Sequence, residues 1–143
     1  MESNSRNVEP SSAGRDGQLV VAACAISAGA HAALVPSHVE HDPQLGLAFV
    51  VAVVLLLAVG VAVTLTAWTA RYAQAAALLF AGLIASYAAA TTVGIPLLSV
   101  DPEPVDGVAL VTKLVESFGL VFALKLNQTV GDRWSPTRQE VSP

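Results

Sequence analysis

All three histidines of the chain lie within eleven residues, in the stretch HAALVPSHVEHD at residues 31 to 42. They are His31, His38 and His41, and Glu40 and Asp42 stand beside them. Imidazole and carboxylate groups together suit divalent transition metals such as Zn²⁺ and Cu²⁺. His38 and His41 are three residues apart, so both lie on one side of the chain if this segment is helical. The spacing H-x6-H-x2-H is not an established zinc signature, so the motif by itself does not identify a metal.

A second pair of ionisable residues lies inside an apolar segment, VALVTKLVESFGLVFALK at residues 108 to 125. Lys113 and Glu116 are three residues apart, so their side chains can meet on one face of a helix. Glu116 lies about 12 Å into this segment if it is helical. A lone carboxylate at such a depth in lipid tends to pair or to take up a proton. We expect it to face a bundle interior and to contact Lys113, a histidine, or a hydroxyl such as Thr91 or Thr92.

Both groups of residues also have structural interpretations. A histidine at a membrane interface often satisfies a nearby carbonyl or faces water, and it can respond to pH because imidazole titrates near neutrality. Lys113 and Glu116 can form an ion pair that fixes the register of a helix. They can also form an ion or proton site, or the inner edge of a metal site, since ionisable residues inside a membrane are often functional. The sequence leaves these alternatives open.

The composition places these residues in a membrane rather than in a soluble domain. Of the 143 residues, 54% are hydrophobic and 13% are charged, whereas soluble domains have about 25% charged residues. Mean hydropathy is +0.62. A soluble fold of this size could not bury so much apolar surface, because small folds expose a large fraction of their area.

Four apolar segments approach the roughly 20 residues that a helix needs to cross a bilayer. They run from about 19 to 35, 45 to 69, 73 to 98 and 108 to 127. Lipid offers no hydrogen bonds to the backbone, so each segment must be helical. Pro36 is expected to close the first segment, Asp42-Pro43 to open the second and Pro96 to end the third early. The predicted fold class is all-α, an integral membrane bundle of four transmembrane helices.

The positions of Lys and Arg set the expected orientation, because cytoplasmic loops carry an excess of these residues. They are Arg6, Arg15, Arg71, Lys125, Arg133 and Arg138 near the predicted inner side. Both termini are therefore predicted to be cytoplasmic, with the chain in the cytoplasmic membrane. Residues 1–18 are predicted to be a disordered tail, 19–128 the transmembrane domain, and 129–143 a second cytoplasmic tail.

This topology brings the histidines and several acidic residues to the outer face. The acidic residues expected there are Glu40, Asp42, Asp101, Glu103 and Asp106. We predict an extracytoplasmic site for a divalent transition metal, copper or zinc. Its predicted ligands are His31, His38 and His41, with Glu40 or Glu103 completing the set. His31 would have to fold back towards the other two histidines, and Glu116 would lie beneath the site as a proton-linked group.

The first apolar segment has an alternative fate. Ala28-Gly29-Ala30 resembles a signal-peptidase site, and Arg15 precedes a short apolar run. Cleavage after Ala30 would make His31 an amino terminus that can chelate copper. We expect an intact helix instead.

Other classes of function are not expected. The net charge is −4 and no basic patch is present, which argues against a nucleic-acid partner. The sequence has no nucleophile elbow, no glycine-rich phosphate loop, no H-E-x-x-H motif and no cysteine pair, so an enzyme is not expected. Cys24, the single cysteine, is expected to be a buried packing residue.

Four motifs carry a resemblance to a group of small four-helix integral membrane proteins from actinobacteria. They are VPSHVEHDPQLGLAF following His31, TVGIP at residues 92–96, EPVDG at 103–107, and Glu116. The group shows a pattern close to H-x-x-x-x-P-E-H-x-x-E, then TGLP, EPVG and a glutamate in the last helix. The resemblance covers about residues 20–125. It marks His31, Pro36, His38, Gly94, Pro96, Glu103, Pro104 and Glu116 as site residues.

This chain departs from the group at two positions of the histidine motif. Ser37 stands where the group tends to have Glu, and His41 stands where an acid is common, which puts the ligand set in doubt. No activity is settled for the group. The resemblance therefore implies topology and the position of a site more than a function.

The sequence favours a small polytopic membrane protein with an extracytoplasmic His/carboxylate site that binds copper or zinc. One alternative is a non-catalytic accessory subunit of a larger membrane complex. Another is an oligomeric proton-coupled transporter or channel. The expected partners are the lipid bilayer and either further copies of the chain or other subunits of a membrane complex.

Overall fold

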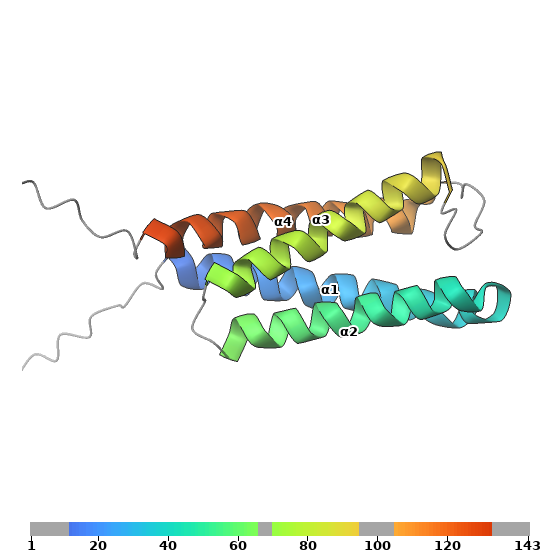
Figure 1. The fold of residues 1–143 in the computed structure, drawn as a ribbon, viewed down its shortest axis with the longest axis horizontal. Helices are drawn as coiled ribbons and strands as arrows, with labels where there is room; N and C mark the ends of the chain where they lie inside the picture. Colours follow the sequence, from blue (N-terminus) through green and yellow to red (C-terminus); the bar gives the residue numbers. More distant parts are fainter. Residues whose placement is uncertain (1–11, 66–69, 95–104, 133–143) are drawn as a thin grey trace, which may run out of the picture.

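The computed structural model describes residues 12–65, 70–94 and 105–132, with side chains for 13–65, 70–94 and 105–130. These residues form four α-helices and no strand (Figure 1). The helices are α1 (Ser12–His41), α2 (Pro43–Leu65), α3 (Ala70–Thr92) and α4 (Gly107–Asp132). All four are long and apolar enough to cross a membrane, which indicates a multi-pass membrane protein. Among the described residues, the prediction of an all-helical fold with four helices long and apolar enough to span a membrane is confirmed.

Successive helices run in opposite directions along the bundle (Figure 1). The start of α1 and the end of α4 lie together at one end, which we call the terminal end. The connection between α1 and α2 lies at the other, which we call the turn end. α1 packs extensively against both α2 and α4, and α3 packs against α4, whereas α2 and α3 touch over a shorter stretch. α1 is therefore the helix most enclosed by its neighbours.

α1 extends beyond both predicted boundaries. It begins at Ser12, inside the predicted tail, and Ala13 packs against Leu126 of α4 at the terminal end. It also continues through Pro36 to His41. A helix of 30 residues spans about 45 Å, more than the roughly 30 Å of a bilayer core. His38, Glu40 and His41 therefore lie on the last turns of a helix and not in a loop.

α1 continues through Pro36, although proline cannot donate to the carbonyl four residues earlier, that of Ala32. Next to it, the carbonyl of Leu34 accepts from Ser37 Oγ at 3.0 Å and from His38 Nδ1 at 2.8 Å. Pro36 itself is exposed.

Asp42 forms the whole connection between α1 and α2. Its backbone N–H donates to the carbonyl of His38 at 2.7 Å, which closes the last turn of α1. Its side-chain Oδ1 accepts from the backbone N–H groups of Gln44 and Leu45, both at 3.1 Å, which caps the start of α2. Pro43 takes the first helical position, where a missing N–H costs nothing. The predicted opening of the second helix at Asp42-Pro43 is confirmed.

The other helix ends have identifiable causes too. α3 ends at Thr92, six residues before the predicted 98, and Gly94 follows with a φ of 72°, a left-handed conformation that suits glycine. Pro96, which we expected to end this helix, lies outside the described residues. Asp106 precedes α4, and its Oδ1 accepts from the N–H of Ala109 at 2.8 Å. α4 continues to Asp132, beyond the predicted 127.

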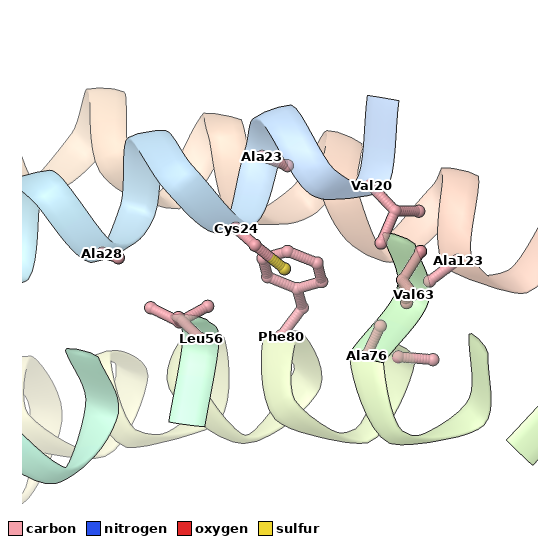
Figure 2. Close-up of a cluster of buried hydrophobic side chains, with 10 residues drawn as sticks. Val20, Ala23, Cys24, Ala28, Leu56, Val63, Ala76, Phe80 and Ala123 are labelled. Carbon is pink, nitrogen blue, oxygen red and sulfur yellow. The ribbon is translucent and has the colours of Figure 1, made fainter. Parts of the chain in front are cut away.

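A small apolar core holds the four helices together towards the terminal end (Figure 2). Phe80 of α3 is fully buried and points towards Cys24 of α1. The helices approach closely because small residues face this ring. A Cβ added to Gly119 of α4 would lie 2.6 Å from Phe80 Cζ and 2.9 Å from the Cβ of Ala23. Cys24 is thus a buried packing residue, as the sequence predicts.

Candidate functional site

Glu116 is fully buried where α4 packs against α1. It lies nine residues after Gly107, which places it about 14 Å along α4 from the turn end. Lys113 Nζ donates to its Oε2 at 2.6 Å. Ser27 Oγ, from α1, donates to its Oε1 at 2.8 Å. Both carboxylate oxygens therefore have a partner, as a buried charge requires.

Lys113 turns into the bundle rather than out towards the membrane surface. Its side chain is 16% exposed. Besides Glu116, its Nζ donates to the backbone carbonyl of Leu83 on α3 at 3.2 Å and lies 5.5 Å from the centre of the Tyr87 ring. A cation over an aromatic face is stabilised by the ring's quadrupole. The ammonium is thus held by α3 and α4 together.

His31 completes this buried group from α1. Its side chain is 7% exposed. Its Nδ1 lies 2.9 Å from the backbone carbonyl of Ser27, and because a carbonyl only accepts, Nδ1 must carry a hydrogen. The other ring nitrogen, Nε2, lies 3.8 Å from Glu116 Oε1. This is beyond hydrogen-bond distance, so Nε2 reaches the carboxylate only after a small movement.

We call Ser27, His31, Lys113 and Glu116 the buried polar cluster. With a neutral imidazole its net charge is zero, because the ammonium balances the carboxylate. One proton added at His31 Nε2 raises the charge to +1 and creates a new donor facing Glu116. The carboxylate of Glu116 would then lie between two cations, the ammonium of Lys113 and the imidazolium of His31.

The predicted contacts of Glu116 are confirmed in part. Lys113 and a histidine are its neighbours, as expected. The hydroxyl is that of Ser27, which the sequence interpretation missed, and not that of Thr91 or Thr92. Those two threonines donate to carbonyls of their own helix instead. One signal in the sequence could have identified Ser27: it precedes His31 by four residues, so both lie on one face of α1.

The other two histidines lie along the same helix towards the turn end. His38 is half-buried and His41 is exposed. The Nδ1 of His38 donates to the carbonyl of Leu34, and that of His41 donates to the carbonyl of Ser37, each at 2.8 Å. The ring of Phe49 on α2 contacts His38 at 4.6 Å and His31 at 5.5 Å between ring centres. Phe49 was also missed in the sequence interpretation.

The predicted metal ligands are not brought together. Within the part of the chain that the structure describes, no group of three or more His, Cys, Asp or Glu side chains could hold a metal ion. The reason is the continuous helix: His31 and His38 are seven residues apart, which is about 10.5 Å of helical rise, so His31 cannot fold back. Glu40 is exposed on the last turn of α1, and Glu103 lies outside the described residues. Metal binding stays a prediction.

Among the described residues, one polar atom near the cluster has no hydrogen-bond partner. Tyr87 Oη is buried and makes no hydrogen bond among the described residues. Its ring faces Lys113, so the tyrosine contributes its aromatic face rather than its hydroxyl.

Fold and site together define a helical membrane protein with an ionisable cluster buried between its first, third and last helices. Comparison of the chain with protein-family models, with curated proteins and with solved structures finds no match. The resemblance to small actinobacterial membrane proteins therefore stays a prediction.

Proposed function

We propose that this chain is a proton-coupled protein of the cytoplasmic membrane, which works as an oligomer and carries its exchangeable proton on the buried polar cluster. The observation that supports this most is the position of His31 Nε2, 3.8 Å from a fully buried Glu116 carboxylate. Of the functions that the sequence left open, we therefore favour the oligomeric proton-coupled transporter or channel.

The energetics of buried ion pairs favour a functional over a purely structural role. Taking two charges out of water costs several kcal/mol per ion, and apolar residues of similar volume are often as stable or more so. Lys113 and Glu116 also need Ser27 and the carbonyl of Leu83 to satisfy them. The ion pair thus depends on two further residues to satisfy its polar atoms. It differs in this from the Ala- and Leu-rich packing elsewhere in the bundle.

The proton step needs no other reactant. A proton arriving at His31 Nε2 converts the neutral ring, already protonated at Nδ1, into an imidazolium. The new N–H donates to Glu116 Oε1 once the two atoms move from 3.8 Å to hydrogen-bond distance. Loss of the proton restores the neutral ring and releases the contact. Such a change in one contact between α1 and α4 is a means of coupling protonation to helix movement.

An oligomer is the form in which this cluster would support transport. The four helices of one copy are packed on a small apolar core, with Phe80 at its centre. Their outward faces carry large apolar side chains, including Leu57, Leu78 and Leu114. These faces suit lipid or further copies of the chain.

With both termini cytoplasmic, the turn end faces outside.

Proton flux into liposomes tests the proposal. Purified protein is reconstituted with a pH-sensitive dye trapped inside, and a pH step is applied together with a potassium diffusion potential. We expect flux with the native chain and none with Glu116→Gln, which keeps the shape of the side chain but removes its charge. Glu40→Gln, the same change at an exposed position on α1, should retain native flux.

The folded state of each variant is checked by gel filtration and by helical content from circular dichroism. Folded Glu116→Gln protein with native flux would overturn the proposal and favour an accessory role. Absence of flux from the native chain would overturn it as well.

A further inference from the structure

Phe49 of α2 lies against two histidines of α1, and its ring contacts each of them. The ring centres are 4.6 Å apart for His38 and 5.5 Å apart for His31, with interplanar angles of 56° and 52°. Two helical turns, about 10.5 Å of rise, separate the two histidines. A proton therefore cannot pass directly from one imidazole to the other while the phenyl ring is in place.

The three histidines form a gradient of exposure towards the turn end. His31 is buried, His38 is half-buried and His41 is exposed. In each of them Nδ1 donates to the carbonyl four residues earlier. Each ring is thus held in one orientation, and Nε2 is the nitrogen left to exchange a proton. The imidazoles of His38 and His41 therefore lie along α1 between the buried polar cluster and the turn end. Each makes the same Nδ1 hydrogen bond as His31.

We propose that protons enter the buried polar cluster from the turn end through His38, and that Phe49 is the gate between His38 and His31. This inference rests on the proposed proton-coupled function and adds its route and its control. When the phenyl ring rotates away, water joins the two Nε2 atoms. The proton leaves the imidazolium of His38, which becomes neutral, and His31 becomes the imidazolium.

The chemistry of the phenyl ring suits a gate. An apolar constriction blocks ion passage because water is excluded from it. The ring thus separates the two imidazoles with an apolar group.

The groups facing His31 come from α1, α2 and α4. They are Ser27 on its own helix, Phe49 on α2 and Glu116 on α4, with Lys113 bound to the other oxygen of that carboxylate. Tyr87 of α3 lies behind the ammonium of Lys113. The carboxylate of Glu116 is the group that attracts a proton to His31. Once Phe49 opens, transfer is therefore directed inwards.

The flux assay in liposomes distinguishes this route from the function itself. We expect Phe49→Leu, which keeps apolar volume but removes the ring, to raise flux several-fold and to weaken its dependence on external pH. Phe118→Leu is the matched control, because Phe118 is exposed on α4 and far along the chain from the histidines. It should behave as the native chain does.

His38→Asn gives a second, independent measurement at a half-buried position, with circular dichroism to check that the variant is folded. We expect it to remove most of the flux, whereas His41→Asn, at the exposed end of the route, should reduce it less. If Glu116→Gln abolishes flux but Phe49→Leu and His38→Asn both match the native chain, the route is wrong and the proton-coupled function stands. If Glu116→Gln has no effect, the function itself fails.

A readout that does not depend on transport completes the test. Nitrogen NMR on histidine-labelled protein follows the protonation of His31 as the external pH is changed. We expect slow exchange in the native chain and faster exchange in Phe49→Leu. Equal exchange rates in the two proteins would overturn the gate.

Discussion

Ser27 on α1 donates a 2.8 Å hydrogen bond to the carboxylate of Glu116 on α4, 89 residues further along the chain. Both side chains are fully buried. The bond joins the first helix of the bundle to the last and fixes one oxygen of the only acidic side chain that is buried among the described residues. Four predictions follow from this contact, from the packing around it and from the histidines beyond it.

Replacing Ser27 by alanine removes the donor to Glu116 Oε1 and leaves that oxygen without its bond. We expect a loss of about 1–3 kcal/mol in unfolding free energy, the cost of an unsatisfied buried acceptor. Unfolding in detergent with increasing denaturant, followed by circular dichroism, measures it. Ser117→Ala is the control, because Ser117 is exposed and donates to the carbonyl of Lys113 within its own helix. Equal stability of the two variants would contradict the prediction.

Lys113→Met leaves the carboxylate of Glu116 buried without its cation. Removing one partner of a buried ion pair typically costs about 3–5 kcal/mol. The double variant Lys113→Met with Glu116→Gln should recover much of this loss, since neither charge remains. The control is Lys125→Met, because Lys125 is exposed and lies over the ring of Phe122. Additive effects in the double variant would show that the two side chains do not interact.

Gly119→Ala tests the closeness of α4 to the core. The added Cβ would lie 2.6 Å from Phe80 Cζ, and the ring cannot shift freely because it is fully buried. Overpacking of this kind costs about 1–3 kcal/mol. Gly82→Ala on α3 is matched in chemistry, but its new Cβ would meet nothing within 4 Å. We expect Gly82→Ala to keep native thermal stability in detergent, and a melting temperature of Gly119→Ala equal to it would contradict the packing.

The metal prediction has its own measurement. If His38 and His41 are ligands, purified protein should bind zinc or copper, and His38→Ala with His41→Ala should lose it. Elemental analysis of the detergent-solubilised protein after dialysis against each metal gives the answer. The proton route predicts the opposite, namely the same metal content in both samples. The experiment therefore separates two uses of the same imidazoles.

Local chemistry explains which parts of the fold the sequence predicts well. Long apolar runs must be helical in lipid, so the four helices follow from composition and length alone. The turn at Asp42-Pro43 follows from the capping ability of one side chain and the fixed backbone of the next. The meeting of Lys113 with Glu116 follows from their spacing of three residues. Each of these depends only on neighbours in the chain.

The predictions that were wrong concern features that neighbouring residues in the chain do not determine. Pro36 was expected to stop α1, but the helix continues through it to His41. That continuation separates His31 from His38 and prevents the compact ligand group that their clustering in the sequence suggested. The spacing of side chains was visible in the sequence, but the path of the backbone between them was not.

The sequence by itself determined four apolar helices, the turn at Asp42 and a charged pair on one face of the last helix. Only the tertiary structure decided that Ser27 and His31 face Glu116, that Leu83 and Tyr87 hold Lys113, and that Phe49 lies against two histidines. The physical reason is that helical periodicity orders side chains within one helix, whereas the rotation of each helix against its neighbours is set by packing. Here Gly119 allows α4 to approach Phe80 more closely than a residue with a Cβ could, and such contacts depend on residues far apart in the chain.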